Sequence, residues 1–136
     1  MDKKYDVIII GAGPSGIFCA YELKRQDPQL KVLMIEKGRC IEKRRCPKRT
    51  TNVCAGCVPC SITTGFAGAG AFSDGKLSLS PDVGGTLPDI LGYEKAEELI
   101  HEADDIYLKF GADRKVYGTD DRAAISAVSY THLTLP

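Results

Sequence analysis

The sequence predicts an α/β fold that begins with a parallel β-α-β unit. Residues 7–10 and residues 31–35 form two apolar runs rich in β-branched side chains, which is typical of buried strands. A glycine-rich turn follows the first run without a spacer, and the segment between the runs has the apolar spacing of a helix. Two strands joined by a helix pair in parallel, so we expect both strands to be neighbours in one sheet.

The glycines of segment 7–16, VIIIGAGPSG, have separate predicted roles. Gly11 permits a tight turn, Gly13 lets the backbone approach a pyrophosphate, and Gly16 lets the next helix pack close to the strand. Free N–H groups and the partial positive charge of the helix N-terminus then face the phosphates. We therefore predict a Rossmann-type phosphate-binding loop composed of Gly11, Ala12, Gly13, Pro14, Ser15 and Gly16.

An acidic residue stands at the end of the second apolar run. Glu36 follows Gly16 by 20 residues, and a carboxylate at this position accepts hydrogen bonds from the ribose hydroxyls of an adenine nucleotide. Lys37 and Arg39 come directly after it and are further candidates for cofactor contact. The alternative is a β-α-β unit with a glycine turn and no ligand.

Two segments resemble known flavoproteins. VIIIGAGPSG together with IEKG at the second strand resembles the N-terminal FAD-binding motif of flavoprotein oxidoreductases, and the Pro14-Ser15 pair favours FAD over NAD by that resemblance. Segment 68–85, GAGAFSDGKLSLSPDVGG, is similar to a family of FAD-dependent dehydrogenases of anaerobic bacteria, in which a cysteine-containing loop precedes it. The resemblance extends to about residue 125. It implies an NAD(P)/FAD-dependent oxidoreductase, with NAD(P)H as a candidate electron donor and the flavin supplying the chemistry.

Composition excludes several other classes. The 136 residues are 43% hydrophobic with a formal net charge of zero, which argues against bulk attraction to nucleic acid or to a membrane surface. No apolar run reaches the length of a membrane span, and the first 16 residues do not have the pattern of a signal peptide. We therefore expect a cytoplasmic protein, in which six cysteines indicate metal or redox chemistry more than disulfides.

Three cysteines have the spacing C-x-x-C-x-x-C. Cys54, Cys57 and Cys60 would need Cys46 or Cys40 as a fourth ligand for an iron–sulfur cluster, because the fourth cysteine of the ferredoxin pattern is absent after them. A tetrahedral zinc site fits the same ligand count. A Cys54/Cys57 dithiol exchanging electrons with the flavin is a third hypothesis, and free cysteines near the cofactor are the fourth.

A basic run and a glycine-rich segment follow the second strand. The basic run is either a solvated face or a source of arginines for the FAD phosphates, with Arg39 best placed, and it comprises Arg39, Lys43, Arg44, Arg45, Lys48 and Arg49. Residues 65–75 are either a flexible linker or a backbone that approaches a flat ring closely. We favour ligand contact there, with candidates Gly70, Ser73, Asp74 and Lys76. Leu77 and Leu79 alternate with serines and predict a short strand.

Residues 89–110 predict one long amphipathic helix that ends at Gly111. His101 falls on its polar face among acidic residues, which indicates a surface histidine more than a catalytic base. The expected apolar stripe consists of Ala96, Leu99, Ile100, Ala103, Ile106, Tyr107 and Phe110. This helix is expected to be structural.

The whole chain is interpreted as an N-terminal, incomplete part of a larger FAD-binding domain. Residues 1–125 would contain the β-α-β unit (1–38), the Cys/Gly-rich cofactor loop (39–88) and the helix (89–111). Residues 126–136 include VSYTHLTLP, which resembles translated sequencing-adapter sequence, and we interpret them as a non-native tail, with a natural short strand as the alternative. Three function classes stay open: a flavoenzyme, a nicotinamide dehydrogenase and a non-catalytic nucleotide-binding module. The sequence assigns no catalytic residue, no substrate and no oligomeric state.

Overall fold

A computed structural model describes residues 4–73 and 75–116. The chain divides into two compact units, and the boundary falls between Lys76 and Leu77. The predicted non-native tail, residues 126–136, lies outside the described residues.

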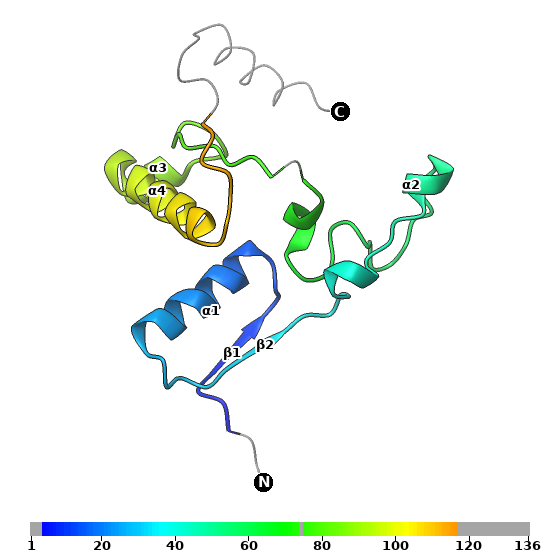
Figure 1. Ribbon diagram of the computed structural model, residues 1–136, viewed down its shortest axis with the longest axis horizontal. Helices are drawn as coiled ribbons and strands as arrows, with labels where there is room; N and C mark the ends of the chain where they lie inside the picture. Colours follow the sequence, from blue (N-terminus) through cyan, green and yellow to red (C-terminus); the bar gives the residue numbers. More distant parts are fainter. Residues whose placement is uncertain (1–3, 74, 117–136) are drawn as a thin grey trace, which may run out of the picture. The chain divides into compact units, whose positions relative to one another are not determined.

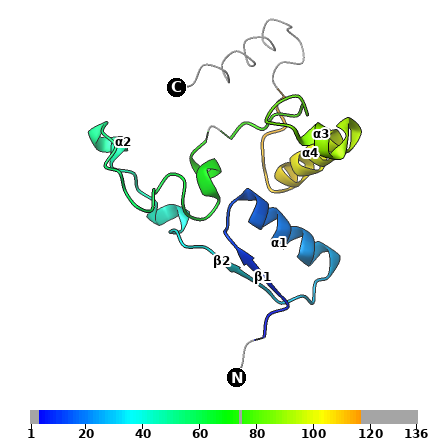
Figure 2. The same cartoon turned by 180° about the vertical axis from the view of Figure 1, so that it is seen from behind.

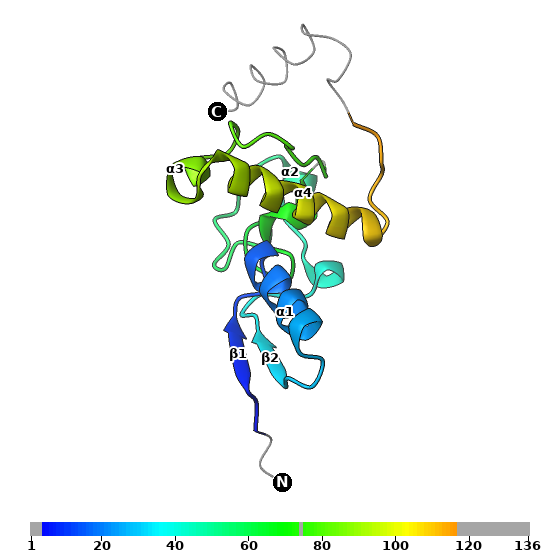
Figure 3. The ribbon, with the colours of Figure 1, turned by 90° about the vertical axis from the view of Figure 1, so that its left-hand side faces the viewer.

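The first unit is built on a parallel strand pair and a crossover helix (Figure 1). Strand β1 (Val7–Ile10) pairs in register with β2 (Val32–Ile35), so that Val7 lies opposite Val32 and Ile10 opposite Ile35. Helix α1 (Pro14–Gln26) connects the strands and packs on one side of the pair, as Figure 3 shows. The predicted parallel β-α-β unit is therefore confirmed, as a small part of a Rossmann-like α/β arrangement.

The strands are less buried than the apolar runs predict. Ile9 is 9% exposed, whereas Ile8 is 57% and Ile10 is 87% exposed. Successive side chains of a strand point to opposite faces, so Ile9 faces α1 and its two neighbours face away from it. The prediction of a strand buried on both faces is wrong for the described chain, because one helix covers one face of the pair.

Two glycines allow α1 to begin directly after β1. Gly11 has a φ of +99°, a conformation that side chains disfavour, and its N–H donates to Ile35 O at 2.7 Å. A Cβ at Gly16 would lie 2.1 Å from Gly11 O and 3.3 Å from Cγ2 of Ile9. These contacts confirm the predicted roles of a tight turn and of close helix–strand packing.

The segment after β2 contains short helices where the sequence predicts a loop. These are the 3₁₀ helix η1 (Ile41–Lys43), the one-turn helix α2 (Lys48–Thr51) and the 3₁₀ helix η2 (Gly68–Phe72). Helix α2 ends at Asn52, whose φ of +58° is tolerated by asparagine. Threonine side chains support its single turn, because the hydroxyls of Thr50 and Thr51 both donate to Pro47 O.

In its described residues, 77–116, the second unit contains two helices instead of one. Helix α3 (Leu87–Leu91) and helix α4 (Tyr93–Lys109) pack together, as Figure 2 also shows. The prediction of one helix over residues 89–110 is wrong because Gly92, with a φ of +84° and a ψ of 154°, interrupts it. Within the described residues, 77–80 form no strand: the Ser80 hydroxyl accepts a hydrogen bond from the Asp82 N–H and the chain turns there.

Most of the predicted apolar stripe of α4 is covered. Ala96 is fully buried at 0% exposure, and the stripe residues 99, 100, 103 and 106 are half-buried. Tyr107 and Phe110 are exposed, and His101 is exposed as predicted. None of the helices in the described part of the chain has the length and apolar character needed to cross a lipid bilayer.

The close packing of α1 on β1 can be tested with a matched pair of glycine substitutions. Gly16→Ala would place a Cβ against the carbonyl oxygen of Gly11, and we expect a loss of about 1–3 kcal/mol in the free energy of unfolding. Gly13→Ala is the control, because no heavy atom lies within 4 Å of the added Cβ and the φ of −76° suits alanine. Urea unfolding monitored by circular dichroism measures both. Equal stability of the two variants would contradict this packing.

Candidate functional site

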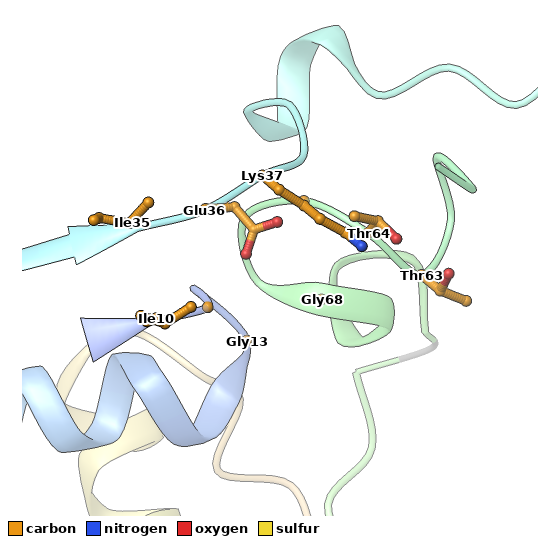
Figure 4. Close-up of a pocket in the computed structure, with 10 residues that line it drawn as sticks. Ile10, Gly13, Ile35, Glu36, Lys37, Thr63, Thr64 and Gly68 are labelled. Atoms are coloured by element: carbon orange, nitrogen blue, oxygen red, sulfur yellow. The ribbon is translucent and has the colours of Figure 1, made fainter. Parts of the chain in front are cut away.

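A cavity of about 370 Å³ opens at the carboxyl ends of β1 and β2 (Figure 4). In open parallel sheets, ligands bind beyond the carboxyl ends of the strands, so this is the expected place for a site. The volume falls within the range of small-molecule pockets. Its lining consists of Ile10, Gly11, Gly13, Ile35, Glu36, Lys37, Thr63, Thr64, Gly65 and Gly68.

The Glu36 carboxylate holds the end of β2 against the glycine loop. Its Oε2 accepts a hydrogen bond from the Ala12 N–H at 2.9 Å, and its Oε1 accepts one from the Gly38 N–H at 2.8 Å. These two N–H groups lower the pKa of Glu36, with smaller contributions from the Gly65 N–H and the Lys37 charge against an opposing effect of desolvation. The side chain is therefore a carboxylate at neutral pH, and in Figure 4 it points from the end of β2 into the pocket.

The N-terminus of α1 forms the opposite side of the pocket. Gly13 is the N-cap residue and makes no side-chain cap, while its carbonyl oxygen accepts the first helical hydrogen bond from Ile17 at 3.0 Å. A Cβ at Gly13 would meet no heavy atom within 4 Å. The helix N-terminus carries a partial positive charge, so the open space beside Gly13 favours an anionic group.

A second wall of the pocket comes from residues 63–68. Thr63, Thr64, Gly65 and Gly68 line it. Backbone hydrogen bonds join this wall to the β-α-β unit: the Ala67 N–H donates to Ala12 O at 2.7 Å. Thr63 and Thr64 were not among the predicted site residues, although they immediately precede the glycine-rich segment 65–75 that is predicted to contact a ligand.

Arg44 is a buried cation behind this second wall. It is 5% exposed, and its guanidinium donates to three backbone carbonyl oxygens, those of Ser61 at 2.9 Å, Ile62 at 2.5 Å and Phe66 at 2.7 Å. Its Cζ also lies 4.7 Å from the centroid of the Phe72 ring. In the sequence, Arg44 is one of six basic residues among which Arg39 is the predicted phosphate contact, and nothing in the spacing distinguishes Arg44. The other five are exposed.

The predicted phosphate-loop residues divide into two groups. Gly11 and Gly13 line the pocket, while Ala12 is buried and donates to Glu36. The remaining three form the first turn of α1: Pro14, Ser15 and Gly16.

The other predicted cofactor residues are only partly brought together. Lys37 lines the pocket, and its side chain extends toward Thr64 in Figure 4. The described lining does not include Arg39, whose side chain is exposed and whose carbonyl oxygen accepts a hydrogen bond from the Phe66 N–H at 3.2 Å.

The remaining predicted contacts lie within or after η2. Gly70 is part of η2, and its carbonyl oxygen accepts a hydrogen bond from the Ser73 hydroxyl at 2.9 Å. Lys76 is exposed and does not belong to the described lining of the pocket. Asp74 lies outside the described residues.

The cysteines do not assemble the metal site that their spacing predicts. Among the described residues, no three His, Cys, Asp or Glu side chains are placed to hold one metal ion. Cys54, Cys57 and Cys60 are free and exposed, as is Cys40, and Cys46 is half-buried. The placement of the described cysteines therefore does not support an iron–sulfur cluster or a zinc site: regular spacing in an exposed loop does not by itself make side chains converge.

Comparison with known proteins places one similarity on the β-α-β unit. Residues 2–41 match the model of the Thi4 family. A thiamine thiazole synthase from Coprinopsis cinerea is 52% identical over 33 residues, which are 24% of this chain and 10% of that protein. The match thus spans about a tenth of the length of the curated relative. No solved structure matches the chain.

The role of Glu36 predicts a pH dependence of stability. Because folding lowers its pKa, the carboxylate stabilises the folded state above the ordinary glutamate pKa of about 4.3, and this contribution is lost as pH falls through the folded-state pKa. We expect Glu36→Gln to be less stable than the wild type at pH 7 and to lose less stability between pH 7 and pH 3. Urea unfolding across this range measures it, and Glu97→Gln on the exposed face of α4 is the control. An unchanged pH slope in Glu36→Gln would contradict the hydrogen bonds seen here.

A second prediction concerns the reactivity of the cysteines. Backbone N–H groups of Thr63 and Ile62 lower the pKa of the Cys60 thiol, helped by the Thr63 hydroxyl and the Arg44 charge. The thiolate is the nucleophile, so we expect exposed Cys60 to be alkylated by iodoacetamide faster than exposed Cys57 at pH 7. Mass spectrometry of timed reactions measures the two rates. Faster labelling at Cys57 would show that the N–H groups around Cys60 do not stabilise its thiolate in solution.

Proposed function

We propose that this chain is the nucleotide-binding segment of an FAD-dependent oxidoreductase and that its pocket holds the ADP part of FAD. The observation that carries the proposal is the geometry of the pocket. A carboxylate at the end of β2 and the open N-terminus of α1 face the same cavity, at the carboxyl ends of two parallel strands. Hydroxyl groups suit the first feature and phosphates suit the second.

The residues present fit such a ligand. Glu36 accepts backbone hydrogen bonds from the N–H groups of Ala12 and Gly38, and the Gly65 N–H also contributes to its lowered pKa. A carboxylate has about four lone-pair sites, so capacity remains for a ribose hydroxyl. The open space at Gly13 lets a pyrophosphate reach the helix N-terminus without meeting a side chain. Ile10 and Ile35 offer apolar contact from the strand ends.

The comparisons support the proposal at the level of this unit. The Thi4 family match covers residues 2–41, which include the glycine loop and Glu36. It excludes the second wall and the whole second unit, and the matched part is 10% of the thiamine thiazole synthase. We therefore propose a shared nucleotide-binding unit and do not extend thiazole synthesis to this chain.

In the proposed enzyme, bound FAD would supply hydride or electron transfer, and NAD(P)H is the candidate electron donor. In this proposal, the described residues bind the cofactor and fix its orientation. Glu36 would fix the adenosine end and the α1 N-terminus the pyrophosphate, while Gly70, Ser73, Asp74 and Lys76 are proposed to lie toward the flavin. Catalytic groups and the substrate site are proposed to lie in the rest of the enzyme, so this chain alone should bind FAD weakly and show no turnover.

The proposal predicts selective binding of ADP-containing ligands without a 2′-phosphate. In titration calorimetry, the chain should bind ADP and FAD, and Glu36→Gln should weaken both by roughly tenfold because a charge-assisted hydrogen bond is worth about 1.5–3 kcal/mol. Gly13→Leu should abolish binding because its side chain would fill the phosphate approach. The 2′-phosphorylated analogue of ADP should bind more weakly than ADP to the wild type, since its phosphate would face the Glu36 carboxylate.

The control is Glu22→Gln, the same substitution at a half-buried position of α1 outside the described lining of the pocket, which should leave ADP affinity unchanged. Absence of ADP and FAD binding by the wild type would overturn the proposal. Preference for NAD over FAD in the same titrations would favour the nicotinamide dehydrogenase alternative.

A further inference from the structure

We infer that Arg44 is a positioning residue that assembles the second wall of the nucleotide pocket. The inference rests on the proposed function of this pocket and goes beyond the glycine loop and Glu36, which belong to the β-α-β unit. Arg44 is not among the residues that line the cavity; it holds both ends of the 61–66 segment, whose central residues Thr63, Thr64 and Gly65 do line it.

The Arg44 guanidinium donates hydrogen bonds to three backbone carbonyl oxygens. Its Nε donates to Ser61 O, its Nη2 to Ile62 O and its Nη1 to Phe66 O, so one planar group joins both ends of the 61–66 turn. A guanidinium presents its donors in a fixed fork, whereas an ammonium is a compact point charge. The three carbonyl oxygens therefore define the shape of this turn through arginine specifically.

A second observation is the space that the structure leaves for Arg44. Gly65 is buried with a φ of +133°, and a Cβ there would lie 2.7 Å from Cδ and 2.9 Å from Nε of Arg44. A Cβ at Gly38 would lie 2.4 Å from Gly65 N. The exit of β2, the second wall and the Arg44 side chain thus pack in direct contact, with glycine at both points of closest approach.

A third observation connects this packing to the pocket. Gly65 lines the cavity beside Thr64, and its N–H contributes to the lowered pKa of Glu36. Residues 66 and 67 are tied by backbone hydrogen bonds to Arg39 and Ala12. Arg44 therefore fixes the wall that faces the proposed ribose-binding carboxylate. Loss of its three hydrogen bonds to carbonyl oxygens should make the backbone of that wall more mobile.

The closing experiment compares two Arg→Lys variants of the full chain with ADP as the probe. Arg49 is the matched control because it is exposed and its Cζ lies 4.8 Å from the same Phe72 ring. We expect Arg44→Lys to weaken ADP binding about tenfold or more by calorimetry and to speed amide hydrogen exchange in residues 62–67. Arg49→Lys should change neither. Equal ADP affinity and equal exchange in the two variants would overturn the inference while leaving the proposed function intact.

Two further measurements distinguish loss of the Arg44 hydrogen bonds from general destabilisation of the chain. Arg44→Ala should regain ADP affinity when guanidinium ion is added at millimolar concentration and should not regain it with ammonium, a difference that general destabilisation would not produce. If Arg44 variants fail to fold, Phe72→Leu removes the ring contact and keeps the carbonyl contacts, so it should leave ADP affinity within about twofold. A tenfold loss of affinity in Phe72→Leu would count against the inference, because the ring and not the carbonyl contacts would then hold the wall. A wild-type chain that binds neither ADP nor FAD overturns the proposed function, and the inference with it.

Discussion

The described first unit depends on one carboxylate that accepts backbone hydrogen bonds from two directions. Glu36 binds the Ala12 N–H of the glycine loop and the Gly38 N–H of its own turn, so it joins the carboxyl ends of β1 and β2. Ala12 and Glu36 are 24 residues apart in the sequence, so this hydrogen bond connects the glycine loop to the distant end of β2. The same arrangement keeps the side chain ionised and aimed at the cavity. The Glu36 carboxylate therefore both stabilises the first unit and provides the proposed contact with the ribose hydroxyls.

Close backbone approach is the second constraint on the site. Gly16 packs against the carbonyl of Gly11, and Gly38 packs against Gly65, at distances where an added Cβ would overlap backbone atoms. The first approach brings the α1 N-terminus to the end of β1. The second brings residues 63–68 beside the end of β2, and together they enclose the cavity on two sides. Close approach of main chain thus encloses the pocket, and Glu36 and Lys37 are the charged residues of its described lining.

The β-α-β unit could be predicted from sequence because its determinants are local. Apolar runs, the glycine loop and Asp27-Pro28 each act within a few residues, and α1 ends at Gln26 as this pattern indicates. The second wall could not be predicted, because Arg44 contacts carbonyls 17 to 22 residues away and resembles the basic residues around it. The cysteines show the same limitation, since spacing does not determine where side chains point. The apolar stripe likewise did not reveal the break at Gly92, because hydrophobic spacing carries no information about φ.

The charges around the cavity suggest how a ligand would be oriented in the proposed site. The carboxylate of Glu36 and the positive end of the α1 dipole lie on different sides of the same space. A ligand with hydroxyls at one end and phosphates at the other satisfies both in one orientation, and the reversed orientation brings phosphate against carboxylate. Arg44 does not belong to the described lining of the cavity, because its guanidinium is buried behind the wall, where it donates to three carbonyl oxygens. It therefore shapes the wall without competing with the helix N-terminus for phosphate. In the proposed site, the residue that positions the wall is thus distinct from the groups that would bind the ligand, Glu36 and the N-terminus of α1.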